Sequence, residues 1–123
     1  YGADISQKLL DLVPQGLYKS LEKIDLNKKL IYEDDKFDSV FCVGTFTFGH
    51  VKPDALDEFI RITKKKGTIC FTINVGVFKD YGFDKKIDSL VAKNKWEKID
   101  FFKSNYLSSK DVNAWLGIYK VTK

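Results

Sequence analysis

The sequence predicts an α/β domain with a mainly parallel sheet, helices on both faces and an antiparallel pair of strands near the C-terminus. Strand-like apolar segments alternate along the chain with segments of helical periodicity, an order typical of parallel sheets. Two segments, residues 37–44 and 68–75, are almost continuously apolar, as strands covered on both faces are. The chain has 123 residues, of which 44% are hydrophobic and 31% charged, which suits one domain with its own core.

The first quarter of the chain predicts two short strands around one helix. Residues 1–3 have the pattern of a strand end, and the pattern breaks at Asp4. A helix is expected over residues 5–13, where apolar side chains recur with helical spacing before Pro14. Residues 21–26 alternate apolar and charged side chains, which indicates an edge strand.

The rest of the chain predicts two further helices and four strands. The apolar strand over residues 37–44 precedes a helix that opens at Pro53 and is expected to run to Lys66, because Gly67 is a typical helix stop. The second apolar strand, residues 68–75, precedes a helix over residues 84–95. Strands over residues 96–102 and 114–121, joined by a polar loop, form the antiparallel pair.

Composition and charge exclude some classes of protein. No apolar run reaches the ~18 residues of a membrane-spanning helix, so no such helix is expected. Residues 1–60 carry 7 Lys and Arg against 11 Asp and Glu, whereas residues 61–123 carry 14 against 6. The basic second half leaves a nucleic-acid partner open, but the lysines are scattered and a solvated surface is the favoured interpretation.

The two cysteines, Cys42 and Cys70, lie inside the two apolar strands. No Cys or His spacing typical of a metal site is present, so no metal is expected. Buried, unbridged thiols on neighbouring strands are expected instead, which suits a reducing compartment such as the cytoplasm, with the nucleus also open.

Candidate site residues follow the predicted strands, because open parallel sheets bind ligands at the carboxyl ends of their strands. Asp4 follows the first strand, where a carboxylate accepts hydrogen bonds from ribose hydroxyls; the alternative is that Asp4 or Ser6 caps the next helix. Asp25 and Leu26 follow the second strand and suit an adenine ring, although a surface turn is an equally good interpretation.

A third candidate segment, residues 43–51, leaves the first apolar strand and combines glycines, aromatic rings and hydroxyl groups. Loops of this composition let a ligand approach the backbone and offer it an apolar wall. The single histidine of the chain, His50, lies here, and a structural hydrogen bond is the favoured interpretation of it.

Taken in order, these fragments resemble the class I S-adenosylmethionine-dependent methyltransferases, which have a Rossmann-like sheet. The resemblance rests on GADIS, on FDSVFCVGTFTFGHVKPDALDEFIRITKKKG and on TICFTI, and it extends over nearly the whole chain. Within this family the chain is most similar to the methyltransferase-like proteins named for the Williams–Beuren critical region, through Gln15-Gly16-Leu17-Tyr18 and the segment Val43-Gly44 to His50-Val51.

The resemblance implies a role for each candidate residue. Asp4 would hold the cofactor ribose, Ile5 would pack on the adenine, and Asp25 and Leu26 would contact the adenine as well. Val43 and Gly44 would line the methionine end of the cofactor. The remaining residues would face the methyl acceptor, namely Thr45, Phe48 and His50.

One element of the family pattern is missing from this sequence. The family has a Gly-rich loop after its first strand, and no G-x-G-x-x-G-like element is found here. Together with the absence of Met, this predicts that residues 1–123 are the C-terminal portion of a single methyltransferase-like domain that lacks its first strand. We therefore expect the isolated segment to bind the cofactor weakly or not at all and to be inactive.

The leading functional hypothesis is methyl transfer from S-adenosylmethionine to an unidentified acceptor by the complete protein. The alternative is a non-catalytic RNA-binding or protein-interaction module on the same kind of fold, for which the basic second half and aromatic residues such as Trp96 and Phe101 would supply contacts.

Overall fold

The computed structural model describes residues 1–49, 51–110 and 112–123, so His50 lies outside the described residues. The chain forms two compact units, Tyr1–Ile31 and Tyr32–Lys123, and each is described by itself. None of the helices described is long and apolar enough to cross a membrane.

The smaller unit contains two parallel strands, β1 (Gly2–Asp4) and β2 (Leu21–Lys23), and one short helix, α1 (Gln7–Leu10). Helix α1 therefore has four residues, fewer than half of those in the helix expected over residues 5–13. A helix of four residues has no continuous apolar face, so Leu9 and Leu12 are exposed and Leu10 is the buried residue of α1.

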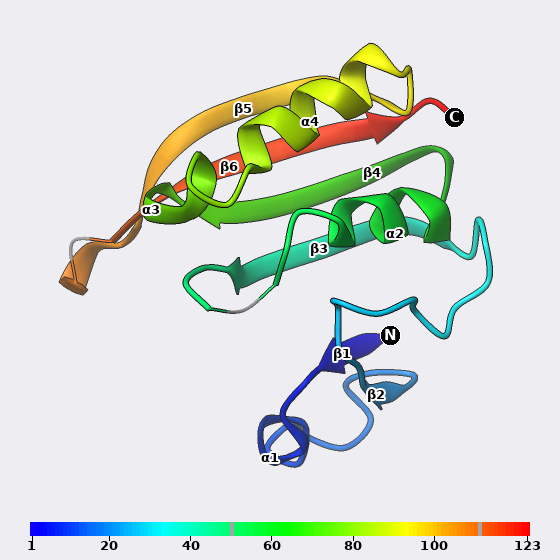
Figure 1. Cartoon of the computed structure of the whole chain (residues 1–123). Coiled ribbons are helices and arrows are strands. Elements are labelled where there is room, and N and C mark those ends of the chain that lie inside the picture. The colour runs from blue at the N-terminus through cyan, green and yellow to red at the C-terminus, as the bar shows by residue number, and fades with distance from the viewer. Residues whose placement is uncertain (50, 111) are drawn as a thin grey trace. The chain divides into compact units, whose positions relative to one another are not determined.

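The larger unit carries a four-stranded sheet in the order β3-β4-β6-β5 (Figure 1). Strands β3 and β4 are parallel, whereas β6 is antiparallel to both of its neighbours. This confirms the α/β fold class, including the antiparallel C-terminal pair. In chain order the elements are β3 (Phe37–Phe46), α2 (Ala55–Ile62), β4 (Thr63–Asn74), α3 (Val75–Phe78), α4 (Phe83–Ala92), β5 (Trp96–Leu107), the 3-10 helix η1 (Ser108–Lys110) and β6 (Val112–Val121).

The helices α2 and α4 pack on the same face of this sheet (Figure 1). Phe46, at the end of β3, is 1% exposed and lies against Phe59 of α2, Phe71 of β4 and Phe83 of α4. The short helix α3 covers the same face of the sheet. Its Phe78 contacts Trp115 of β6, which lies opposite the buried Ile73 of β4. Within the described larger unit the helices α2, α3 and α4 lie on one face of the sheet, the face on which Ile69, Phe71 and Ile73 of β4 are fully buried.

The lysines of residues 64–66 lie in β4 and not at the end of a helix. Helix α2 ends at Ile62, and Thr63 already pairs with Phe37 of β3. The register then shifts before Ser39 pairs with Thr68, and Lys66 has a positive φ of 70° within this irregularity. Pairing with β3 thus ends the helix earlier than Gly67 would, because the neighbouring strand supplies hydrogen bonds that a helical continuation would lose.

Cys42 and Cys70 are unbridged and lie on the neighbouring strands β3 and β4, as expected. Cys42 is buried, but Cys70 is only half-buried, so the expectation of burial is wrong for Cys70. Phe41 is the residue opposite Cys70, which places the two cysteines on opposite faces of the sheet because side chains alternate along a strand. Only Cys42 shares the face covered by helices.

We expect alkylation by iodoacetamide at pH 8 to modify Cys70 well before Cys42. Burial raises the pKa of Cys42 to about 11, an effect larger than the opposing hydrogen bond from Thr45. At pH 8 its thiolate population is then about a hundredfold below that of an ordinary thiol, and the rate for Cys42 continues to rise with pH beyond 9. Mass spectrometry of each peptide measures this, with urea-unfolded protein as the control; equal rates in the folded protein would contradict it.

Candidate functional site

The carboxyl ends of β1 and β2 bring together the four candidate residues of the smaller unit. The two strands are parallel, with Asp4 opposite Lys23, and the Ile24 N–H donates to the Asp4 carbonyl oxygen at 3.0 Å. Asp4 and Asp25 therefore follow neighbouring strands at one edge. Ile5 and Leu26 are the residues that come next, and Ile5 is 61% exposed.

The carboxylate of Asp4 shapes the turn after β1. Its Oδ1 accepts a hydrogen bond from the Ser6 N–H at 2.8 Å, and Ser6 in turn caps α1 by accepting from the Leu9 N–H at 3.3 Å. The cap is thus Ser6, and not Asp4. Because Oδ2 of Asp4 has no partner among the described residues, this half-buried carboxylate keeps an oxygen for a ligand.

Asp25 forms a similar local turn. Its Oδ1 accepts a hydrogen bond from the Asn27 N–H at 2.9 Å, and both Asp25 and Leu26 are half-buried. The surface-turn interpretation therefore describes the backbone here. It is compatible with a ligand contact, since a carboxylate has more than one acceptor position. The groups at this edge, two hydrogen-bond-accepting carboxylates beside apolar side chains, fit the ribose and adenine of a nucleoside.

In the larger unit, Gly44 bends the carboxyl end of β3. Its φ is 77°, in the left-handed region that favours glycine, and the register with β4 shifts between Cys42 and Phe46. The Gly44 N–H donates to the Thr72 hydroxyl at 3.0 Å. Since that N–H is already bonded, Gly44 offers a ligand close approach and not a free donor. Val43 beside it is 60% exposed.

The loop after β3 is fixed to residues that follow β4. The Gly49 N–H donates to the Tyr81 hydroxyl at 3.0 Å, and the rings of Phe48 and Tyr81 meet edge to face with centroids 6.4 Å apart. A Cβ on Gly76 would lie 2.5 Å from Cζ of Phe48, so the ring lies directly on Gly76. The structure therefore brings Phe48 to the carboxyl end of β4.

Sequence reasoning missed Asn74, Gly76 and Tyr81 at this edge. Asn74 ends β4, and its Oδ1 accepts from the Gly76 N–H at 2.8 Å. A signal was available, since Asn74 and Gly76 come at the end of the second apolar strand, as Gly44 does for the first. The involvement of Tyr81 had no such signal, because it depends on the folding of a loop 32 residues earlier.

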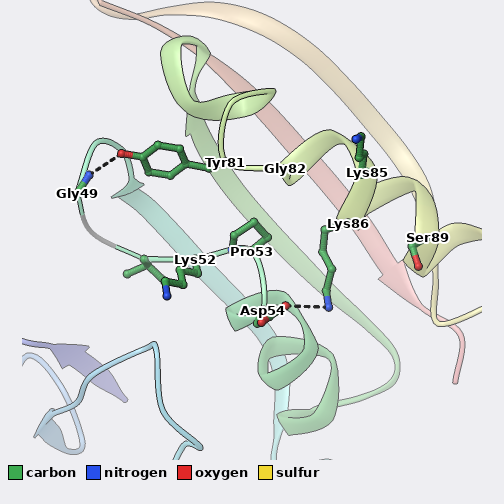
Figure 2. Close-up of a pocket in the computed structure, with 10 residues that line it drawn as sticks. Gly49, Lys52, Pro53, Asp54, Tyr81, Gly82, Lys85, Lys86 and Ser89 are labelled. Atoms are coloured by element: carbon green, nitrogen blue, oxygen red, sulfur yellow. Dashed lines mark hydrogen bonds and ion pairs between the residues drawn. The ribbon is translucent and has the colours of Figure 1, made fainter.

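A pocket of about 810 Å³ lies on the other side of this loop, against α4 (Figure 2). Lys86 lines it and pairs with Asp54 at 3.2 Å and with Asp57, so its charge is already compensated. Lys85 points away from that pair in Figure 2. The polar groups of the pocket do not converge on one point, and the strand ends remain the better candidate site. Among the described residues no group of His, Cys, Asp or Glu could hold a metal ion.

The two parallel strand pairs, with the Asp4 carboxylate at the end of one strand and the Gly44 bend at the end of another, have the arrangement of α/β proteins, a class that commonly binds ligands at strand ends. The sequence model of a known family, described as a methyltransferase domain, matches residues 1–71, and the chain belongs to this family. No curated protein matches the sequence.

Solved structures agree with the fold at low identity. A Listeria monocytogenes protein described as an S-adenosylmethionine-dependent methyltransferase is 12% identical, with a TM-score of 0.69 over 99% of this chain and 79% of that one. The N-methyltransferase NodS of Bradyrhizobium japonicum is 13% identical, with a TM-score of 0.68 over 98% and 72%. The [4+2]-cyclase SpnF, 14% identical with a TM-score of 0.59 over 83% and 55%, shares the fold with a different activity.

Proposed function

We propose that residues 1–123 belong to a class I methyltransferase that transfers a methyl group from S-adenosylmethionine to an acceptor. The observation that carries the proposal is Asp4, a half-buried carboxylate at the carboxyl end of β1 in a chain of the methyltransferase-domain family. Its position suits the two ribose hydroxyls of the cofactor. A NodS structure contains S-adenosyl-L-homocysteine, the product that this reaction would leave.

The cofactor supplies a methyl group on a positively charged sulfur. When bound, it would supply this methyl group to an acceptor atom by in-line displacement, in which the sulfur would keep the electron pair of the broken sulfur–carbon bond. Such a displacement depends on proximity and alignment more than on a dedicated acid or base. The chain's own residues therefore act by positioning the two reactants.

The proposal assigns a part of this positioning to each candidate residue. Asp4 binds the ribose, while Ile5, Asp25 and Leu26 hold the adenine. Val43 and Gly44 approach the methionine end.

The acceptor side consists of Thr45, Phe48 and His50. Thr45 donates its hydroxyl to the Cys42 thiol, which leaves Phe48 as the described side chain with the largest exposed surface in this group. His50 enters the proposal by its place in the sequence alone.

The complete domain contains at least one further strand, paired with the free edge of β3. Within the described larger unit β3 pairs with β4 alone, so its other edge has no partner strand. Unpaired edges of apolar strands are a liability that proteins normally cover. This supports the assignment of residues 1–123 to the C-terminal portion of a single domain.

Titration calorimetry tests the proposal. We expect a longer protein that includes the strand next to β3 to bind S-adenosylmethionine, and residues 1–123 alone to bind it weakly or not at all, because the backbone groups for the methionine end are missing. S-adenosylhomocysteine should compete in the longer protein. Micromolar affinity of residues 1–123 alone would contradict the division of the site, and no binding by the longer protein would contradict the function.

A non-catalytic RNA-binding module receives little support from the charges. In the basic groove beside the end of α2, Arg61 pairs with Glu58 and Asp34, and Lys123 pairs with Asp35 at 3.0 Å. Cations held by carboxylates are poor candidates for phosphate contacts.

The proposal also includes the Williams–Beuren-type subgroup and a cytoplasmic location. The Gln15–Tyr18 motif supports the subgroup, and the unbridged thiols support the location.

A further inference from the structure

We propose that the loop of residues 47–49 presents Phe48 as an aromatic wall for the methyl acceptor, and that Tyr81 is the positioning residue that holds this wall. The corresponding ligand is a planar, mainly apolar group that carries an oxygen able to accept a hydrogen bond. This inference deepens the proposed function and rests on it for the identity of the ligand as the acceptor.

Two contacts fix the loop, and they come from different residues. The Tyr81 hydroxyl accepts the hydrogen bond of the Gly49 N–H at 3.0 Å, and Figure 2 shows the Tyr81 ring extending toward Gly49. The Tyr81 ring also meets the edge of Phe48. One side chain thus restrains the backbone and the ring of consecutive residues, which removes much of the freedom of an exposed loop.

Gly76 is the second contact, and it determines where the Phe48 ring lies. The ring occupies the space that any Cβ at position 76 would need, since Cζ and Cε2 would lie 2.5 and 3.1 Å from it. Because Gly76 is the second residue after β4, the ring lies at the carboxyl end of that strand, where parallel sheets bind their ligands. Phe48 is nevertheless 59% exposed, so the ring keeps a large surface for a partner.

Asn74 gives the polar part of the ligand class. Its Oδ1 accepts from the Gly76 N–H, and a Cβ at Gly76 would lie 3.1 Å from that oxygen and 2.5 Å from Cζ of Phe48. The Nδ2 group of the same amide donates to none of the described residues. A ligand beside Phe48 is therefore close to an amide with a hydrogen-bond donor, which an oxygen acceptor on the ligand would satisfy.

The positioning role is tested first by amide hydrogen exchange, measured by NMR on residues 1–123. Tyr81→Phe keeps the ring contact with Phe48 and removes the hydroxyl acceptor. We expect exchange at Gly49 to accelerate about three- to tenfold, the range that loss of one hydrogen bond gives. Tyr119→Phe is the matched control, since it removes a hydroxyl on β6. Unchanged exchange at Gly49 in Tyr81→Phe would overturn the positioning role.

The ligand class is tested with benzamide, which has a planar ring and a carbonyl oxygen, against acetamide, which has the same amide without the ring. We expect benzamide to shift the amide signals of Gly49 and Gly76 at concentrations about tenfold lower than acetamide does. Phe48→Ala and Gly76→Ala should abolish this preference, while Val75→Ala, in the same helix, should preserve it. Tyr81→Phe should weaken benzamide binding without lowering the melting temperature.

Equal shifts with both compounds, or benzamide shifts that survive in Phe48→Ala, would overturn the aromatic wall. These outcomes are separate from the cofactor titration. If benzamide binds as expected but the longer protein does not bind S-adenosylmethionine, the subsite stands and methyl transfer fails. If the cofactor binds and benzamide shows no preference for Phe48, methyl transfer stands and the ligand class is wrong.

Discussion

Asp4→Ala should lower the affinity of the longer protein proposed above for S-adenosylmethionine about ten- to a hundredfold. Hydrogen bonds to a charged carboxylate contribute about 1.5–3 kcal/mol each, and coupling between two ribose bonds together with replacement by water reduces their sum. The Oδ2 of Asp4 is available among the described residues, whereas Oδ1 holds the Ser6 N–H. Calorimetric titration of the purified variant measures the loss.

The matched control for this prediction is Ser6→Ala. Ser6 is the cap of α1, so its removal should cost ~1 kcal/mol of stability while leaving cofactor affinity nearly unchanged. Asp4→Ala also removes the turn hydrogen bond, and some loss of melting temperature is therefore expected in both variants. An Asp4→Ala protein that melts earlier but binds the cofactor normally would show that Asp4 serves the turn alone.

Phe46→Ala should lower the free energy of unfolding by about 3–5 kcal/mol, the usual cost of removing a buried Phe side chain. The Phe46 ring contacts Phe59 of α2, Phe71 of β4 and Phe83 of α4. Its replacement by Ala leaves a cavity between these three elements, which cannot all move inward to fill it. Since small domains are stable by only about 5–15 kcal/mol, a large part of the protein should be unfolded at modest urea concentration. Circular dichroism during urea titration measures the change.

Phe41→Ala on the same strand is the control, because Phe41 is 73% exposed and should cost far less. A loss below about 1 kcal/mol for Phe46→Ala would mean that the core can close around the missing ring. Similar losses for both variants would show that the Phe41 side chain is packed against other residues in solution.

The segments that could be predicted best are those in which a short run of apolar residues indicates burial. Residues 37–44 and 68–75 are apolar almost throughout; the first segment lies within β3, and the second lies within β4 except for Val75, which begins α3. The antiparallel pair at the C-terminus was likewise predictable, since a short polar connection allows only that direction. The residues at strand ends followed from the same reasoning, which placed Asp4 and Asp25 at one edge of a parallel pair.

Helix boundaries were predicted less well, because they depend on competition with distant strands. The lysines of residues 64–66 suit the end of a helix as well as they suit a strand. Pairing of Thr63 with Phe37 decides between them. In α1 the spacing of the apolar residues indicated a longer helix. A single helical turn, however, gains too little free energy to extend further when it has no apolar face packed against the protein.

Local patterns of residues predict the α/β class, the order of most elements and the candidate residues at the carboxyl ends of β1, β2 and β3, because these are properties of neighbouring residues. The contacts of Phe48 with Tyr81 and Gly76, and the packing of α2 and α4 on Phe46, arise only when distant parts of the chain fold together. These contacts join residues 13 to 37 positions apart. Their energies depend on shape and on the space left by other side chains, which no local pattern of residues records.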